Sequence, residues 1–131
     1  MAYILDTDIV IEHLRNNIPV TQMIEQLAGI AIYLSWATVA ELYAGAFTSP
    51  HPIGKINAIR DATRDFTVLR PDDVTATRFA EIRSLLRRRG QLILDLEMII
   101  AATAVQHDLT LITLNRRHFE RIPDLRLYAF Q

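Results

Sequence analysis

The sequence predicts an α/β fold in which a small parallel sheet has helices on both of its faces. Short apolar runs of strand length alternate along the chain with longer segments whose apolar residues recur at helical spacing. One of these segments, residues 96–105, is apolar almost all round, which is typical of a helix buried at the centre of a domain. No internal repeat or linker divides the 131 residues, so we expect one domain, residues 1–131.

The first half of the chain is expected to contain two strands and four helices. Pro19 suits the first turn of a helix, Gly29 ends that helix, and Ser35 is placed to cap another. In chain order the elements are a strand at 3–5, helices at 7–15 and from 19, a strand at 30–34, and helices from 35 and at 53–65.

The second half is expected to contain two helices and three short strands. Asp72 or Asp73 caps a long amphipathic helix, which closes at three arginines, residues 87–89, and Gly90. The buried helix at 96–105 follows it. Strands are expected at 68–69 and 109–114, and 127–128 adds an edge.

The composition excludes several classes of protein. There is no cysteine, which excludes a disulfide scaffold, a thiol nucleophile and a Cys-ligated metal site. The net charge of −1 argues against a protein that permanently coats nucleic acid, but it allows local contact with RNA or DNA. No apolar run reaches the ~20 residues that cross a bilayer. The N-terminus lacks the features of a signal peptide, so we expect a cytoplasmic protein without membrane contact.

Oxygen-bearing side chains gather at one edge of the predicted sheet. In a parallel α/β sheet, ligands bind at the carboxyl ends of the strands, where successive loops converge. Four chain segments bring acidic or amide side chains to that edge: Asp6 and Asp8 after the first strand, Glu41 after the second, Asp95 and Glu97 at the start of the buried helix, and Asn115 after the strand at 109–114.

Crowded carboxylates repel one another, and burial of a carboxylate is costly unless a cation or another partner compensates it. Oxygen ligands without cysteine and with few histidines favour Mg²⁺ or Mn²⁺ over zinc. A site of this kind activates water and stabilises the in-line displacement of a phosphoryl group. The coincidence of the four segments therefore predicts a divalent metal site.

Each residue also has a purely structural interpretation. Asp6 and Asp95 stand at positions typical of helix N-caps, and Asp8 and Glu97 lie in first helical turns, where the helix dipole favours a carboxylate. Glu41 is an ordinary exposed helix glutamate when it is taken alone, and Asn115 suits a turn. No single residue decides between the two interpretations.

Arginines near the same edge are candidates for phosphate contact. Arg116 and Arg117 follow the last predicted inner strand, and the planar guanidinium suits phosphate recognition. Thr7 and Thr113, which adjoin the acidic positions, are further candidates for substrate contact. The arginines at 87–89 are more typical of a solvated helix end, and Lys55 is the single lysine of the chain.

Four motifs occur in order along the chain: Ile4-Leu5-Asp6-Thr7-Asp8, Thr38-Val39-Ala40-Glu41-Leu42, the segment from Asp95 to Ala104, and the segment from Leu111 to Phe119. Together they resemble the motifs of the PIN-domain ribonucleases, and within them those of the VapC-type toxins of bacterial toxin–antitoxin pairs. The segment Glu120-Arg121-Ile122-Pro123-Asp124-Leu125 is also similar to the usual tail of that subgroup. The resemblance covers nearly the whole chain and implies a three-layer sandwich.

The resemblance also implies roles for the acidic residues. Asp6 matches the first acidic ligand, Glu41 the second, and Glu97 a position that is usually aspartate. Asp95 matches a position that is often acidic, so either it or Glu97 is the main third ligand. Asn115 falls at the fourth position, and Asp8 stands where many members have asparagine or serine. An uncharged oxygen at 115 favours a single, tightly held ion.

The activity that the resemblance implies is Mg²⁺- or Mn²⁺-dependent endonucleolytic cleavage of RNA by metal-activated water. It also implies a homodimer and a cognate antitoxin of the VapB type, whose C-terminal segment covers the active groove.

Two other functions remain open from the residues. Asp6-Thr7-Asp8 after a hydrophobic strand is also similar to the first motif of haloacid-dehalogenase-type phosphatases, in which one aspartate is a nucleophile and the next a general acid. Glu97 and Asn115 in place of aspartates are compatible with an inactive binding module.

Overall fold

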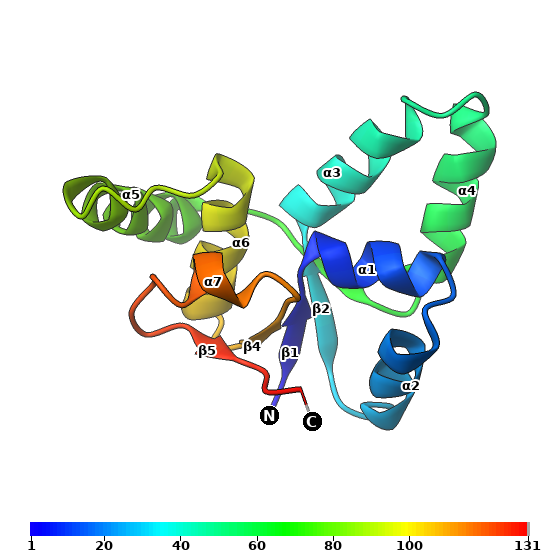
Figure 1. Ribbon diagram of the computed structural model, residues 1–131, viewed down its shortest axis with the longest axis horizontal. Helices are drawn as coiled ribbons and strands as arrows, with labels where there is room; N and C mark the ends of the chain where they lie inside the picture. The colour runs from blue at the N-terminus through cyan, green and yellow to red at the C-terminus, as the bar shows by residue number, and fades with distance from the viewer. Residues whose placement is uncertain (131) are drawn as a thin grey trace.

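The computed structural model describes residues 1–130 and contains one parallel five-stranded sheet in the order β3-β2-β1-β4-β5 (Figure 1). Every neighbouring pair of strands is parallel. The strands are short, which suits a sheet that is covered on both faces. They are β1 (Tyr3–Leu5), β2 (Ile32–Ser35), β3 (Thr67–Leu69), β4 (Thr110–Ile112) and β5 (Arg126–Leu127).

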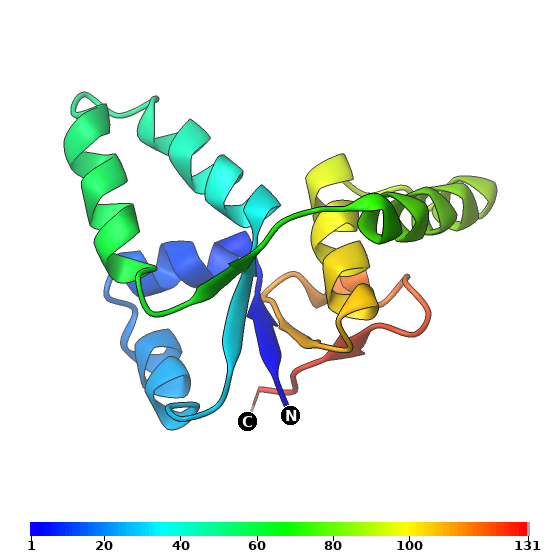
Figure 2. The ribbon, with the colours of Figure 1, turned by 180° about the vertical axis from the view of Figure 1, so that it is seen from behind.

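Seven helices form the layers on either side of this sheet. Helices α1–α4 lie on one side and α5–α7 on the other, as the two opposite views show (Figures 1 and 2). The predicted three-layer α/β fold is therefore confirmed. The helices are α1 (Thr7–Leu14), α2 (Ile18–Gln26), α3 (Trp36–Ala46), α4 (Pro52–Ala62), α5 (Asp73–Arg88), α6 (Asp95–Gln106) and α7 (Arg116–Phe119).

The central strand β1 divides the core into two clusters because successive side chains of a strand point to opposite faces. Tyr3 and Leu5 pack into the cluster formed with α1–α4. Ile4 packs into the other cluster, which α5, α6 and α7 supply. Helix α6 is buried on several sides, as its apolar sequence predicts: Met98, Ile100, Ala101, Ala102 and Ala104 are all fully buried.

Two strand boundaries differ from the sequence prediction for identifiable reasons. Strand β2 begins at Ile32 rather than at residue 30, because a turn at Gly29, with a φ of +85°, separates it from α2. Strand β4 ends at Ile112 rather than at residue 114, since Thr113 and Leu114 leave the sheet to bond to aspartate side chains. The long helix α5 is capped by Asp72, and Asp73 is its first residue.

The short helix α7 is absent from the sequence prediction. It has four residues, too few for an apolar period to show in the sequence. It places Asn115 and His118 beside the start of α6.

The strand register brings the ends of three strands level with one another. Leu5 pairs with Leu34 of β2 on one side and with Ile112 of β4 on the other. The residues that follow these strands therefore meet at one edge of the sheet. None of the helices formed by residues 1–130 has both the length and the apolar character that crossing a bilayer requires.

Candidate active site

Asp6 is the most buried of the predicted acidic residues, with an exposed fraction of 6%. It caps the N-terminus of α1, and its Oδ1 accepts a hydrogen bond of 2.8 Å from the Thr7 amide. Its Oδ2 accepts one of 2.7 Å from the Thr113 hydroxyl, which follows β4. Burial, and after it the charge of Asp8, raise the pKa of Asp6 from 3.8 to about 7, although both hydrogen bonds lower it.

Asp8 extends this connection between α1 and the segment after β4. Its Oδ2 accepts hydrogen bonds from the Leu114 amide (3.1 Å) and the Thr113 hydroxyl (3.4 Å). Its other oxygen, Oδ1, is buried and has no hydrogen-bond partner among residues 1–130. Burial raises the pKa of Asp8, and the negative charge of Glu97 adds to this effect. An uncompensated carboxylate oxygen of this kind calls for a cation or a proton.

Glu41 is linked to Asp6 through Thr7. The Thr7 hydroxyl lies 2.7 Å from Glu41 Oε1 and donates a hydrogen bond to it, while the Thr7 amide bonds to Asp6. Glu41 also lines a groove of about 370 Å³ between α1, α3 and α4. Arg15 and Lys55 line the same groove, which therefore combines one carboxylate with two cations.

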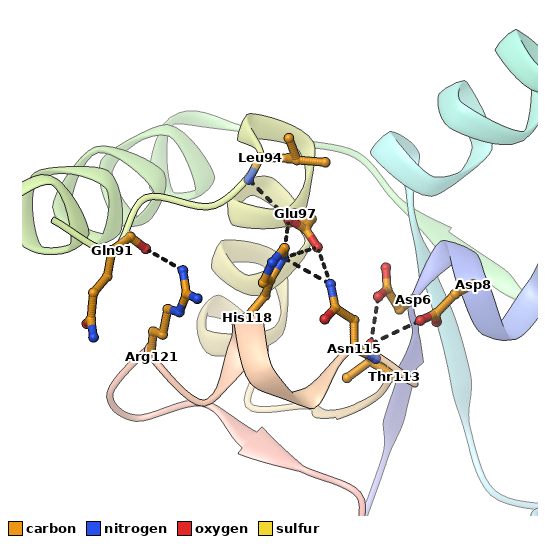
Figure 3. A network of polar contacts seen from close by, with 9 residues as sticks. All are labelled: Asp6, Asp8, Gln91, Leu94, Glu97, Thr113, Asn115, His118 and Arg121. Atoms are coloured by element: carbon orange, nitrogen blue, oxygen red, sulfur yellow. Dashed lines mark hydrogen bonds and ion pairs between the residues drawn. The ribbon is translucent and has the colours of Figure 1, made fainter.

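Glu97 lies at the start of α6 with its side chain 12% exposed. Its carboxylate accepts hydrogen bonds from the Leu94 amide (3.0 Å) and the Asn115 Nδ2 (3.0 Å), and His118 Nδ1 lies 3.0 Å from Oε1 (Figure 3). Glu97 also raises the pKa of Asp6 and of Asp8, so its charge bears on both aspartates.

Asp95 lies outside this cluster, contrary to the prediction that it shares the site. Its side chain is 71% exposed and pairs with Arg83 of α5 at 3.7 Å. The reason is helical geometry, because residues two positions apart point to different sides of a helix. Since Glu97 faces the sheet edge, Asp95 faces away from it. It is not the N-cap of α6 either, because that position belongs to Leu94.

The four predicted substrate contacts fall into two groups. The hydroxyls of Thr7 and Thr113 donate hydrogen bonds to Glu41 and Asp6, respectively, which indicates a role in orienting these carboxylates. The Arg116 guanidinium donates to the Tyr128 carbonyl and pairs with Glu120. Arg117 is exposed, and among residues 1–130 no hydrogen bond or ion pair engages its guanidinium, in contrast to that of Arg116.

The donor chemistry of the cluster fits a hard divalent cation. Its acidic side chains offer oxygen ligands, and one of these, Asp8 Oδ1, is buried without a hydrogen-bond partner among residues 1–130. The pKa of Asp6 is raised as expected for an uncompensated charge. Within residues 1–130, no three acidic or histidine side chains converge closely enough to ligate one ion together. Mg²⁺ commonly uses one or two carboxylates and retains several waters, so the Asp6–Asp8 pair meets that requirement.

Sequence reasoning missed the contributions of His118, Arg15 and Lys55. The sequence suggests no role for His118, whereas in the structure its ring lies against Glu97. The spacing of Asn115 and His118, three residues apart, would have placed them on one face of a helix if α7 had been recognised. Arg15 and Lys55 are forty residues apart, and nothing in their local sequence signals that they share a groove with Glu41.

Comparisons with known proteins agree with this architecture. Residues 3–125 match the PIN domain family. The chain is 37% identical over 127 residues to ribonuclease VapC2 of Haemophilus influenzae, with 96% of each chain covered. It is 30% identical over 126 residues to the tRNA(fMet)-specific endonuclease VapC of Shigella flexneri, again with 96% of each covered.

A solved structure extends the comparison over the whole chain. The crystal structure of VapBC2 from Rickettsia felis bound to a DNA fragment from their promoter has a TM-score of 0.92 and 25% identity, and it covers 100% of both chains. The phosphatase alternative loses its basis, because 96% of the chain aligns with a ribonuclease and residues 3–125 match the PIN domain family. The chain belongs to the PIN-domain family and, within it, to the VapC ribonucleases.

Proposed function

We propose that this chain is a metal-dependent endoribonuclease that acts as the toxin of a toxin–antitoxin pair. The observation that carries the proposal is the pair of Asp6, which is buried, and Asp8, which is half-buried, at the carboxyl edge of the sheet, with Glu97 close by and Glu41 joined to Asp6 through Thr7. Three separate chain segments supply these groups, and a fourth supplies Thr113, which bonds to both aspartates. A structural role alone does not account for the unpartnered oxygen of Asp8.

PIN-domain nucleases generally use a divalent metal, and Mg²⁺ or Mn²⁺ is the ion we propose here. Asp6 and Asp8 would hold it, with Glu97 as the third acidic residue. When bound, such an ion activates water and neutralises the charge that develops on the phosphate in the transition state. Thr113 and Thr7 hold the Asp6 carboxylate from both sides, so that neither oxygen turns away from the site.

Glu41 has a different role in this proposal. Its carboxylate lies beside a groove and is fixed by the Thr7 hydroxyl, which suits a group that orients or deprotonates the attacking water. Arg15 and Lys55 in the groove, together with Arg117 at the end of β4, would bind the phosphates that flank the cleaved bond. The RNA backbone would thus cross the carboxyl edge of the sheet.

The proposed partner is an antitoxin of the VapB type, because the solved relatives include VapBC complexes that match this chain over its full length. A homodimer in the cytoplasm, where RNA is available, completes the proposal. The antitoxin would suppress activity by covering the edge at which Asp6 and Glu41 lie.

The direct test is RNA cleavage by the purified chain with Mg²⁺ or Mn²⁺. Because one relative is a tRNA(fMet)-specific endonuclease, initiator tRNA is the first substrate to try, followed by total tRNA and messenger RNA. Asp6→Asn and Glu41→Gln should each reduce cleavage by at least 100-fold. Asp61→Asn removes an exposed carboxylate of α4 that pairs with Arg64. This variant is the matched control, and we expect it to have wild-type activity.

Two results would contradict the proposal. Cleavage that persists at the wild-type rate in Asp6→Asn would remove that carboxylate from the reaction. A wild-type chain that binds no Mn²⁺ at millimolar concentration and cleaves none of these RNAs would favour the inactive binding module.

A further inference from the structure

Glu97 is held more tightly than any other carboxylate of the site. Three donors converge on it: the Leu94 amide at the start of α6, and Asn115 and His118 from the segment of α7 (Figure 3). His118 Nδ1 lies 3.0 Å from Oε1 and 3.1 Å from Oε2, so it reaches both carboxylate oxygens. Neither Asp6 nor Asp8 has an imidazole partner within residues 1–130.

The contact with Glu97 depends on which nitrogen of His118 carries the hydrogen. Asn115 Nδ2 donates to Glu97 Oε2 and also lies 2.9 Å from His118 Nδ1. A carboxylate accepts hydrogen bonds, so His118 donates to Glu97 in the tautomer that carries its hydrogen on Nδ1. In that tautomer the imidazole and the amide donate side by side to one carboxylate.

The side chain of Glu97 is one methylene longer than that of an aspartate. This extra length explains why contacts from Asn115 and His118 are needed to orient its carboxylate. The Leu94 amide draws the carboxylate back toward the start of its own helix, as a glutamate in the first turn of a helix commonly does. Without other partners, this hydrogen bond would keep the Glu97 carboxylate at the start of its own helix, away from Asp6 and Asp8. Asn115 and His118 pull from the direction of β4, where the segment that carries Thr113 also contacts Asp6 and Asp8.

The short helix α7 is itself fastened against α6. Arg121, just after α7, donates from its guanidinium to the Gln91 carbonyl in the loop that precedes α6, at 3.1 Å (Figure 3). Phe119 of α7 is fully buried in the core cluster that contains α6. These contacts fix the position of α7 and therefore of His118. A residue that orients another side chain must itself be held in place.

We propose that His118 is a positioning residue whose Nδ1–H, together with the Asn115 amide, holds the Glu97 carboxylate toward Asp6 and Asp8 so that it can take part in binding a divalent cation. The identity of that ion rests on the proposed function. His118 itself does not touch the ion or the RNA in this proposal, and acts only through Glu97. Residues that orient metal ligands in this way typically affect metal affinity 10–100-fold.

The test is a calorimetric titration of metal-free protein with Mn²⁺, which does not depend on a known RNA. His118→Phe keeps a ring but removes the donor, and His118→Asn keeps an amide donor near the position of Nδ1 but removes the ring. We expect Mn²⁺ affinity to fall about 10–100-fold in His118→Phe and to stay within about threefold of wild type in His118→Asn. His51→Ala is the matched control, because this histidine is exposed and its side chain makes no capping hydrogen bond to α4. It should bind Mn²⁺ with wild-type affinity.

Thermal unfolding of each variant without metal separates orientation from folding, and both His118 variants should melt close to the wild type. Wild-type affinity in a folded His118→Phe would overturn the positioning role while it leaves the proposed function intact. Equal losses in His118→Phe and His118→Asn would also overturn it, because ring packing would then matter more than the donor. A wild-type chain that binds no Mn²⁺ would instead overturn the metal site of the proposed function.

Discussion

Asp6 shows how a single side chain can be stable in position and yet unfavourable in charge. Two short hydrogen bonds hold its oxygens, but burial and the nearby Asp8 raise its pKa to about 7. Near neutral pH the folded chain therefore carries a carboxylate that gains from either a proton or a cation. Metal binding by Asp6 and the folding stability of the chain are consequently linked.

This linkage predicts a pH dependence with a defined sign. The folded pKa of Asp6 lies above the unfolded value of 3.8, so the folded state retains the proton longer. The stability that the protonated group contributes is complete below about pH 4 and is lost as the pH rises through about 7. Each pKa unit corresponds to ~1.4 kcal/mol, which limits the loss to about 4 kcal/mol.

Asp6→Asn should remove this dependence. Metal-free Asp6→Asn is expected to be more stable than wild type by about 1–3 kcal/mol at pH 8, and similar to it at pH 4. Urea unfolding at the two pH values, with chelator present, measures the difference. An Asn variant that is less stable than wild type at pH 8 would contradict the interpretation of Asp6 as an uncompensated charge.

Individual residues differ in how far their roles can be predicted from sequence. The end of β1 positions Asp6 and Asp8, and the first turn of α6 positions Glu97. The strand end and the helix start can both be recognised from sequence patterns. Asp95 could not be assigned in this way, because its rotation away from the site depends on which side of α6 faces the sheet. His118 could not be assigned because its role depends on a contact between segments that are 21 residues apart.

At the scale of elements, α6 connects the core to the site. Its first turn supplies Glu97, and residues 100–104 are buried between α5 and the sheet. An apolar segment without a polar face predicts this burial from sequence alone. The short α7 was not predictable in the same way, since four residues provide no period and its position is fixed by Phe119 and Arg121.

The packing of α6 predicts the effect of a larger side chain. Ala102→Leu adds three carbon atoms at a fully buried position, so it should lower the free energy of unfolding by roughly 1–3 kcal/mol. Urea denaturation measures this change. Ala58→Leu, at an exposed alanine of α4, is the matched control and should change stability by less than about 0.5 kcal/mol. Equal stability of the two variants would mean that α6 is not packed as described.

At the scale of the whole molecule, parallel topology creates the site. The strand register places the ends of β1, β2 and β4 level, so residues from distant segments meet at one edge. This convergence follows from the alternation of strands and helices, which is why the meeting of these side chains at one edge was predictable from the sequence. The groove with Arg15 and Lys55 was not, because it depends on how α1, α3 and α4 pack against one another.

The measurement that tests the central claim most directly is an anomalous difference map from crystals of the metal-free chain soaked in Mn²⁺. We expect one strong peak within coordination distance of the Asp6 and Asp8 carboxylates, with Glu97 next to it, and no such peak in crystals of Asp6→Asn. A map from saturated crystals with no peak at these residues, or with its strongest peak elsewhere on the molecule, would contradict the account.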